Sequence, residues 1–189
     1  VDAAWITAST SAHNAMQIGF NETARQAVLR DPKWRGGDYP SDDPPVIGLA
    51  VARMLGHLSY LSEASFEHKF ARNLQTDQSE PGRGRPLFQV ESYLRHQADK
   101  FTQRFDAGSL VALSDAIDRY RCSSLAPARC RYLFTSFVSD WLYPSHQSRT
   151  LHQMALAAGK RSEWSEIDLP YGHDAFLLDG EQQGALVYD

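Results

Sequence analysis

Residues 131–173 read RYLFTSFVSDWLYPSHQSRTLHQMALAAGKRSEWSEIDLPYGH, and this stretch decides the fold. The aromatic and β-branched residues over 131–138 predict a buried strand, and the alternation over 164–169 predicts a second one. The segment between them has the signals of a helix that starts at Pro144–Ser145 and stops at Gly159. A strand, a helix and a strand at this spacing are typical of a parallel βαβ unit.

Two residues that could carry chemistry follow these strands. Asp140 comes just after the first strand, in SFVSDWLYP, and His173 comes after the second, in LPYGHDAFLL. We expect both at the carboxyl ends of neighbouring strands, in the chain order in which a catalytic triad presents its acid and its base. The alternative is an aspartate that solvates a loop and a histidine with a structural role. The residues alone leave both interpretations open.

Working outward from this unit, the first residues predict another strand, over 2–9 (DAAWITAS). Apolar residues then recur at helical spacing in three stretches, 47–61, 90–105 and 110–120. The Pro- and Gly-bearing stretches GGDYPSDDPP (36–45) and QTDQSEPGRGRP (75–86) are expected to be loops.

This pattern predicts an α/β fold with an inserted, all-helical lid. We assign residues 1–30 to a strand and connection of the α/β core, 31–126 to the lid, and 127–189 to the rest of the core. A helical block in this position is expected above the carboxyl ends of the strands, where α/β proteins bind ligands. The chain opens on a strand-like segment and closes on a helix-like one, so we expect it to be part of a longer polypeptide.

The composition excludes several classes of protein. A formal charge of −4 over 189 residues gives no basic surface for nucleic acid. No apolar run is long enough to span a membrane, and no signal peptide is visible, so a cytoplasmic protein is expected. Cys122 and Cys130 are expected to be free thiols, with a small disulfide loop as the alternative. No metal is expected, because His57 and His68 do not have the spacing of a helical metal-binding pair.

Several long blocks of the chain resemble the homoserine O-acetyltransferase family, whose members are α/β-hydrolase-type acyltransferases. The resemblance covers nearly the whole chain. It is strongest in five blocks: NAMQIGFNETARQAVLRDPKWRGGDY (14–39), GLAVARMLGHLSYLS (48–62), VESYLRHQADKFTQRFDAGS (90–109), SFVSDWLYPSHQSR (136–149) and YGHDAFLL (171–178).

The resemblance implies that Asp140 is the triad acid and His173 the triad base, on the C-terminal part of an α/β-hydrolase fold. The family's nucleophilic serine lies in a G-G-S-M-G-G turn, and this sequence has no such turn. The pair Gly108-Ser109 lies between two predicted lid helices and lacks the flanking glycine. The serine and the oxyanion hole are therefore expected in an N-terminal part of the same enzyme.

Two further residues are substrate-binding candidates by the same resemblance. Arg25 matches the arginine that binds the carboxylate of the amino-acid substrate, and a guanidinium suits a carboxylate because it donates paired hydrogen bonds. Asp174 matches the aspartate that binds the amino group. From the residues alone, a solvated helix arginine is the better explanation of Arg25. The alternative for Asp174 is the N-cap of the final helix, and both of its roles can coexist.

The expected function is transfer of an acetyl group from acetyl-CoA, a co-substrate and not a tightly bound cofactor, to the hydroxyl of homoserine. The family resemblance also implies a homodimer formed through the lid. Alternatives on the same fold are a serine or homoserine O-succinyltransferase and a deacetylcephalosporin C acetyltransferase. More remote alternatives are an esterase, in which water accepts the acyl group, and a non-catalytic helical module.

Overall fold

The computed structural model describes residues 1–79, 86–178 and 180–188, and the chain divides into two compact units. The first, which we call the sheet unit, consists of three segments: Val1–His13, Ser59–Ser65 and Tyr120–Asp189. The second, which we call the helical unit, consists of two: Asn14–Leu58 and Phe66–Arg119.

The sheet unit is built on three parallel strands. They are β1 (Ala3–Thr7), β4 (Arg131–Phe137) and β5 (Ser162–Ile167), in the order β1-β4-β5. The central strand β4 is the most deeply buried, and its Phe134 and Phe137 are fully shielded from solvent. The three predicted strands and the parallel βαβ unit are therefore confirmed, with β5 beginning two residues earlier than 164.

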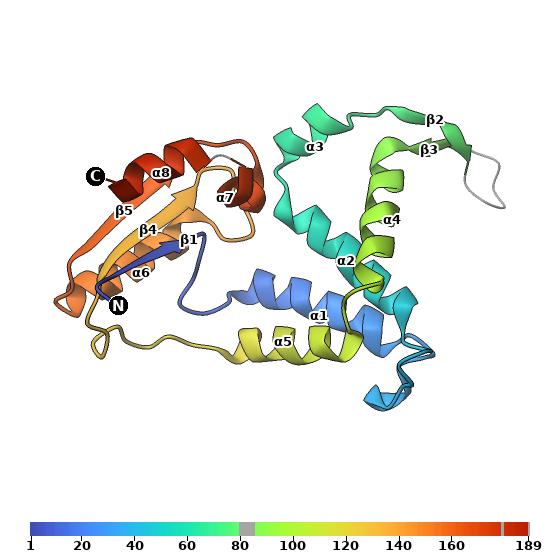
Figure 1. Cartoon of the computed structure of the whole chain (residues 1–189), viewed down its shortest axis with the longest axis horizontal. Helices are drawn as coiled ribbons and strands as arrows, with labels where there is room; N and C mark the ends of the chain where they lie inside the picture. Colours follow the sequence, from blue (N-terminus) through green and yellow to red (C-terminus); the bar gives the residue numbers. More distant parts are fainter. Residues whose placement is uncertain (80–85, 179, 189) are drawn as a thin grey trace. The chain divides into compact units, whose positions relative to one another are not determined.

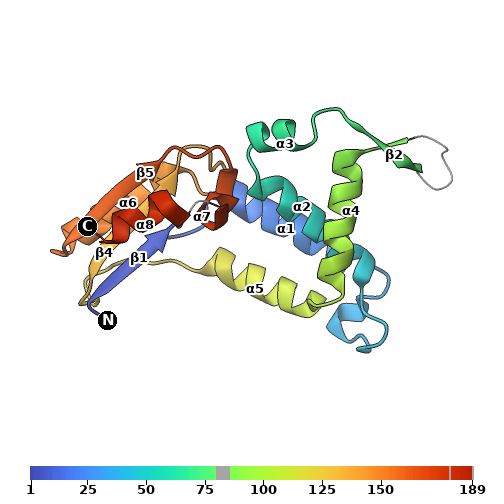
Figure 2. The ribbon, with the colours of Figure 1, turned by 45° about the horizontal axis from the view of Figure 1, so that its top comes forward.

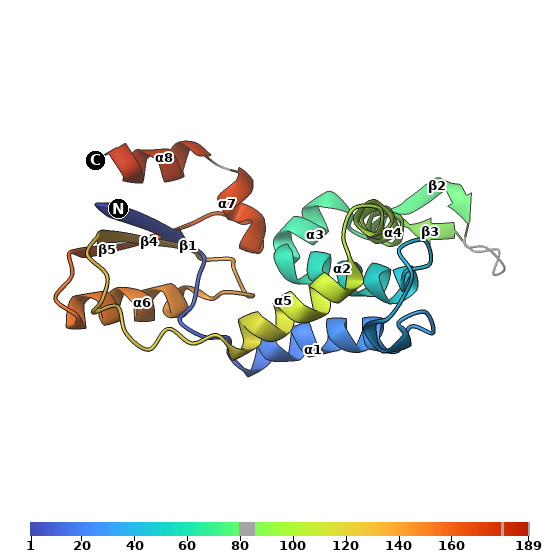
Figure 3. The same cartoon turned by 60° about the horizontal axis from the view of Figure 1, so that its bottom comes forward.

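Helices cover both faces of this sheet (Figures 1 and 3). α6 (Ser145–Ala157) lies on one face, while α7 (Ala175–Leu178) and α8 (Gly180–Tyr188) lie on the other. The cluster on the α6 side has the buried members Tyr132, Phe134, Leu151 and Ala155. The cluster on the other side has the buried members Ala8, Phe137, Ile167, Leu169 and Ala175.

The end of α6 agrees with the signal predicted from the sequence. Gly159 has a φ of 70°, in the left-handed region that suits glycine. Its N–H donates to the carbonyl of Leu156, and the N–H of Lys160 donates to the carbonyl of Ala155. These two bonds make a Schellman motif, which satisfies the last carbonyls and ends the helix.

The helical unit contains α1 (Ala15–Leu29), the 3-10 turn η1 (Arg35–Gly37), most of α2 (Val46–Tyr60), much of α3 (Glu63–Lys69), α4 (Gln89–Thr102) and α5 (Ala107–Arg119). α1 and α5 run side by side (Figures 1 and 2). The buried core of the unit is Val28, Leu49, Ala52, Phe101 and Ala107. The three stretches with helical spacing, which became α2, α4 and α5, are therefore confirmed as helices.

The division into units differs from the expected boundaries in three places, one of which is residues 120–126, expected in the lid but part of the sheet unit. Residues 14–30, expected with the core, lie in the helical unit because α1 packs its Val28 into that unit's core. Residues 59–65, expected in the lid, belong to the sheet unit. Their contacts there are described with the candidate site.

The loop predicted over 75–86 is wrong for all of its described residues. β2 (Leu74–Ser79) pairs antiparallel with β3 (Pro86–Phe88), so both ends of the stretch are strands. Residues 80–85 of this stretch lie outside the described residues.

Candidate active site

Asp140 lies just beyond the carboxyl end of β4, in a turn that surrounds its carboxylate with donors. The residue is 3% exposed. Its Oδ1 accepts the backbone N–H of Leu142 at 3.0 Å and that of Tyr143 at 2.8 Å. Donors aimed at one oxygen stabilise the ionised form and leave the other oxygen for a further partner.

That further partner is His173, which lies in the 3-10 turn η2 (Gly172–Asp174) after β5. His173 Nδ1 is 2.8 Å from Asp140 Oδ2. An ionised carboxylate only accepts hydrogen bonds, so Nδ1–H is the donor in this contact and Nε2 takes no part in it. The side chain of His173 is 18% exposed, whereas that of Asp140 is fully buried. This arrangement can orient an imidazole and stabilise its protonated form.

The two loops that carry this pair are fastened to each other. The hydroxyl of Ser139 donates to the carbonyl of Leu169 and accepts the N–H of Gly172 at 2.9 Å. Ser139, next to Asp140, therefore makes hydrogen bonds to both ends of residues 169–172, which lead from β5 to His173. We call residues 169–173 the histidine loop.

A third segment, Ser59–Ser65, makes hydrogen bonds to both loops, and we call it the α2–α3 corner. Trp141 Nε1 donates to the carbonyl of Leu61 at 3.0 Å. The hydroxyls of Ser62 and Ser65 both donate to the carbonyl of Pro170, the latter at 2.9 Å. These bonds explain why the corner belongs to the sheet unit although it lies between two helices.

Gly172 is needed where this corner meets the histidine loop. Its φ is 72°, and a Cβ at this position would lie 2.5 Å from the backbone nitrogen of Ser62 and 2.7 Å from the carbonyl carbon of Leu61. Only a glycine allows the two backbones to approach this closely.

Three aromatic rings surround the imidazole of His173. Tyr143 stacks on it with ring centroids 4.9 Å apart, Phe176 meets it edge-on at 5.4 Å, and Tyr60 of the corner is tilted at 6.1 Å. Sequence reasoning did not assign a role to any of them. The only available signal was position, since Tyr143 and Phe176 each lie three residues after a member of the pair.

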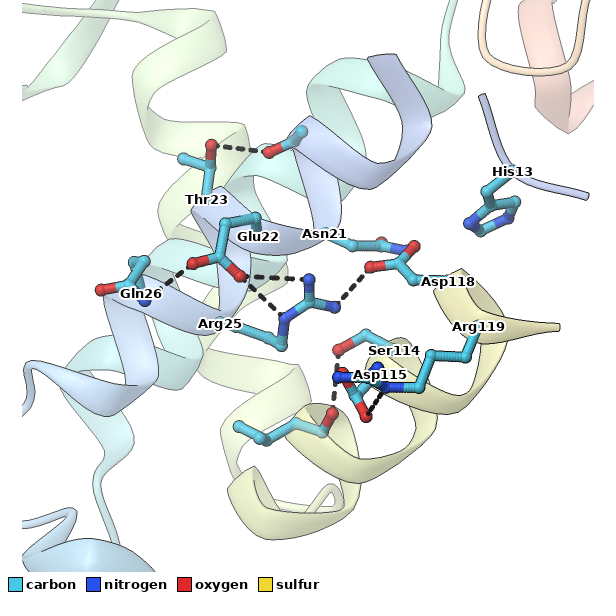
Figure 4. A network of polar contacts seen from close by, with 12 residues as sticks. His13, Asn21, Glu22, Thr23, Arg25, Gln26, Ser114, Asp115, Asp118 and Arg119 are labelled. Carbon is cyan, nitrogen blue, oxygen red and sulfur yellow. Dashed lines mark hydrogen bonds and ion pairs between the residues drawn. The ribbon is translucent and has the colours of Figure 1, made fainter. Parts of the chain in front are cut away.

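The substrate candidate Arg25 lies in the helical unit and already has two carboxylate partners (Figure 4). Its Nη1 is 2.6 Å from Asp118 Oδ2, and its Nε and Nη2 are each 3.1 Å from Glu22 Oε2. Arg25 is only 8% exposed, so it is not the solvated helix arginine of the alternative interpretation. Burial lowers its pKa, but the two carboxylates raise it by more, and the net direction is upward.

Asp174 lies in η2, next to His173 and directly before α7. Arg25 and Asp174 therefore belong to different units, and the clamp predicted from the resemblance stays a prediction. Asp118, which binds Arg25 and also accepts a hydrogen bond from Asn21 at 2.8 Å, was missed at the sequence level. It lies 93 residues from Arg25 in the chain, so no local pattern could reveal the pair.

Other candidate chemistry is sparse within the described part of the chain. Cys122 and Cys130 are free thiols. Among the described residues, no three His, Cys, Asp or Glu side chains come together as a metal site. No helix there is both long enough and apolar enough to cross a membrane.

Both the sequence and the fold of the chain are similar to those of known proteins. No family model matches the chain. It is 45% identical over 192 residues to a homoserine O-acetyltransferase of Solidesulfovibrio magneticus, covering 95% of this chain and 48% of that protein. It is 40% identical to a homoserine O-succinyltransferase of Bordetella petrii, covering 96% of this chain and 46% of that protein. The chain thus spans about half the length of the curated relatives it matches.

The fold comparison gives the same family together with esterases. A homoserine O-acetyltransferase from Bacillus anthracis superposes with a TM-score of 0.84 at 23% identity, over 100% of this chain and 52% of that one. Esterase E22 superposes with a TM-score of 0.84 at 20% identity, over 99% of this chain and 53% of that one. These likenesses establish the α/β-hydrolase fold, and over nearly its whole length the sequence of the chain is similar to about half of a homoserine O-acetyltransferase.

Proposed function

We propose that this chain supplies the acid and the base of an acyltransferase that moves an acetyl group from acetyl-CoA to the hydroxyl of homoserine. The observation that carries the proposal is the Asp140–His173 pair, a fully buried carboxylate 2.8 Å from an imidazole nitrogen at adjoining strand ends. The similarity to homoserine O-acetyltransferases supports it. We assign the nucleophilic serine and the oxyanion hole to an N-terminal part of the same enzyme, because the relatives are about twice as long.

The proposed reaction has two halves. In the first, Nε2 of His173 takes the proton of the serine hydroxyl while the serine oxygen attacks the thioester carbon. The imidazolium then protonates the sulfur, and CoA leaves as a thiol. In the second, Nε2 takes the proton of the homoserine hydroxyl, that oxygen attacks the acyl-enzyme, and the proton returns to the serine. Asp140 stays ionised throughout and holds Nδ1–H.

We further propose that Arg25 and Asp174 recognise the amino acid, through its carboxylate and its ammonium group respectively. The contacts of Arg25 with Asp118 and Glu22 do not use all five of its N–H donors. The remaining donors are the ones that a substrate carboxylate would accept from. The helical unit is proposed as the lid, pairing two subunits of a cytoplasmic homodimer.

The first test uses the full-length protein that carries this chain. His173→Ala should lower kcat by about 10⁴- to 10⁶-fold, because it removes the base, and Asp140→Asn by about the same or less, because the imidazole loses its carboxylate partner and its preferred tautomer. His146→Gln, an exposed histidine on α6, serves as the control and should keep activity. Retention of more than roughly a tenth of the activity by His173→Ala would mean that the base is misassigned.

The second test separates the two half-reactions by rapid quench. Asp174→Asn and Arg25→Lys should leave the acyl-enzyme burst intact, because acyl-CoA contacts neither residue in this proposal. The transfer to homoserine should fall roughly 30- to 1,000-fold in kcat/KM, because Asp174→Asn removes the negative charge and Arg25→Lys removes the paired guanidinium hydrogen bonds. Equal losses in both halves would contradict the assignment of these residues to the acceptor.

A second candidate function is ester hydrolysis, in which water takes the acyl group. The specific observation that favours it is the superposition on esterase E22. Product analysis distinguishes the two, since the transferase yields O-acetylhomoserine from acetyl-CoA and homoserine, whereas the hydrolase yields acetate whether or not homoserine is present. The succinyltransferase alternative is tested in the same assay with succinyl-CoA as donor.

A further inference from the structure

Tyr143 contacts both members of the acid–base pair. Its backbone N–H donates to Asp140 Oδ1 at 2.8 Å. Its ring lies on the imidazole of His173, with the centroids 4.9 Å apart and the planes at 25°. The residue therefore takes part in the turn that holds the acid and also covers one face of the base.

The far end of this tyrosine is held by a residue from a distant part of the sequence. The Tyr143 hydroxyl is 2.7 Å from Nε2 of His13, which follows β1 and lies 130 residues earlier in the chain. The two rings also meet edge-on, with centroids 5.7 Å apart. Tyr143 is thus fixed at its backbone by Asp140 and at its hydroxyl by His13, so its ring has little freedom to swing away.

The hydrogen bond to Asp140 cannot by itself fix the plane of the imidazole. One bond between Nδ1 and Oδ2 fixes one atom, and the ring can still turn about the line that joins them. Such a turn would move Nε2, the nitrogen that exchanges protons in the proposed reaction. The flat contact with Tyr143, together with the edge contact of Phe176 at 5.4 Å and 69°, opposes this rotation.

We infer that Tyr143 is a positioning residue for His173, and that His13 acts on the base only through the Tyr143 hydroxyl. The inference rests on the proposed function, because it assigns Nε2 of His173 the proton transfers. It predicts a graded loss of activity. Removing the Tyr143 hydroxyl should leave the Tyr143 ring less firmly held, and removing the ring should abolish its contact with His173.

The kinetic test measures the acylation half-reaction in the full-length protein. Tyr143→Phe and His13→Gln should each slow acylation by about 3- to 10-fold, the effect of one lost hydrogen bond. Tyr143→Leu should slow it on the order of 10²-fold, as expected for a displaced base. The double variant Tyr143→Phe/His13→Gln should be no slower than the slower single variant, because both changes break the same bond. Tyr171→Phe, an exposed tyrosine, and His146→Gln are the matched controls.

A spectroscopic readout separates positioning from general stability. In protein labelled at histidine, the carbon-bound ring protons of His173 should be shifted upfield by the stacked tyrosine. The shift should disappear in Tyr143→Leu and decrease in Tyr143→Phe and His13→Gln, while urea midpoints confirm that the variants are folded. If Tyr143→Leu does not fold, the other two variants carry the test.

The outcomes distinguish the two proposals. If the wild type turns over acyl-CoA but the variants keep both its acylation rate, within about twofold, and the His173 signals, the positioning role is overturned. If the wild type shows no turnover while the signals shift as described, the proposed function fails and the geometric role of Tyr143 stands. Additive losses in the double variant would overturn the part assigned to His13.

Discussion

At the scale of single residues, the ion pair between Arg25 and Asp118 is shielded from water. Their side chains are 10% and 7% exposed, and the two atoms in contact are 2.6 Å apart. By contrast, the neighbouring pair of Arg119 and Asp115 on α5 is 78% and 47% exposed (Figure 4). A buried charge that loses its partner costs far more than an exposed one, so the two pairs should respond differently to mutation.

Arg25→Ala should destabilise the helical unit by roughly 3 kcal/mol, because it leaves the carboxylate of Asp118 buried without its cation. Urea unfolding at neutral pH measures this. Arg119→Ala is the control and should hardly move the midpoint, since water solvates Asp115. An equal, small effect of both changes would contradict the importance of burial here. The prediction also bears on function, because activity lost in Arg25→Ala must be corrected for lost folding.

His57 should make the stability of the helical unit depend on pH. It is 7% exposed, and burial above all, then the nearby charges of Arg53 and Lys69, lowers its pKa from 6.5 to about 4. Below pH 6.5 the unfolded chain binds a proton there that the folded chain does not, so the free energy of unfolding falls as the pH drops toward 4.

The decrease in the free energy of unfolding that is due to His57 should reach at most about 3 kcal/mol near pH 4. Most of the range from pH 7 to 5 lies above the pKa values of ordinary carboxyl groups, so the effect of His57 can be measured there. The urea midpoint of the wild type should decrease as the pH is lowered from 7 to 5. His57→Gln should flatten this decrease, whereas His146→Gln, which changes an exposed histidine, should not. If His57→Gln keeps the full slope, another group is responsible.

At the scale of elements, hydrogen bonds connect the loops after β4 and β5 to each other and to the α2–α3 corner. Gly172 lies where the histidine loop meets the corner, and Gly159 ends α6 with nothing close to its missing side chain. Both have positive φ, at 72° and 70°. Substitution by alanine therefore strains the backbone equally at both positions, but only at Gly172 does the new methyl group meet other atoms.

Gly172→Ala should consequently lower the acylation rate of the full-length protein on the order of 10²-fold, because it pushes His173 away from its position. Gly159→Ala should cost only about 1 kcal/mol of stability, with the acylation rate of the folded protein unchanged. Single-turnover acylation and urea unfolding of both variants measure this. Similar acylation rates in the two variants would show that the corner does not position the base.

At the scale of the whole molecule, the parallel sheet has three strands among the described residues. β1 and β5 each have one neighbour in it, and Trp5 on β1 is 45% exposed. The relatives are about twice as long as this chain. Both observations support the proposal that the catalytic serine and the oxyanion hole are supplied by an N-terminal part.

The isolated chain should therefore release no thiol from acetyl-CoA above the rate of its own Asp140→Asn/His173→Ala double variant. A thiol-trapping assay with both purified proteins measures this, and the chain produced together with the N-terminal part is the positive control. Thiol release by the isolated chain alone would show that it holds its own nucleophile, and the assignment of the serine elsewhere would fail.

Local patterns in the sequence determined the framework that positions the site. The strands around Phe134, the helix that ends at Gly159 and the placement of Asp140 and His173 after neighbouring strands all follow from hydrophobic periodicity and turn chemistry. These signals depend on residues close together in the chain, so they can be read without knowledge of the rest of the fold. The pairing of β2 with β3 was missed because β2 is mostly polar and β3 has only three residues.

Only the tertiary structure decided which distant residues meet. The contact of His13 with Tyr143 and that of Arg25 with Asp118 join residues 130 and 93 positions apart, and the corner at 59–65 joins the sheet unit from between two helices. Such contacts are fixed by how whole elements pack, and packing depends on the shapes of many side chains at once. A sequence pattern can therefore place Asp140 and His173 at the same edge, but not the residues that hold them there.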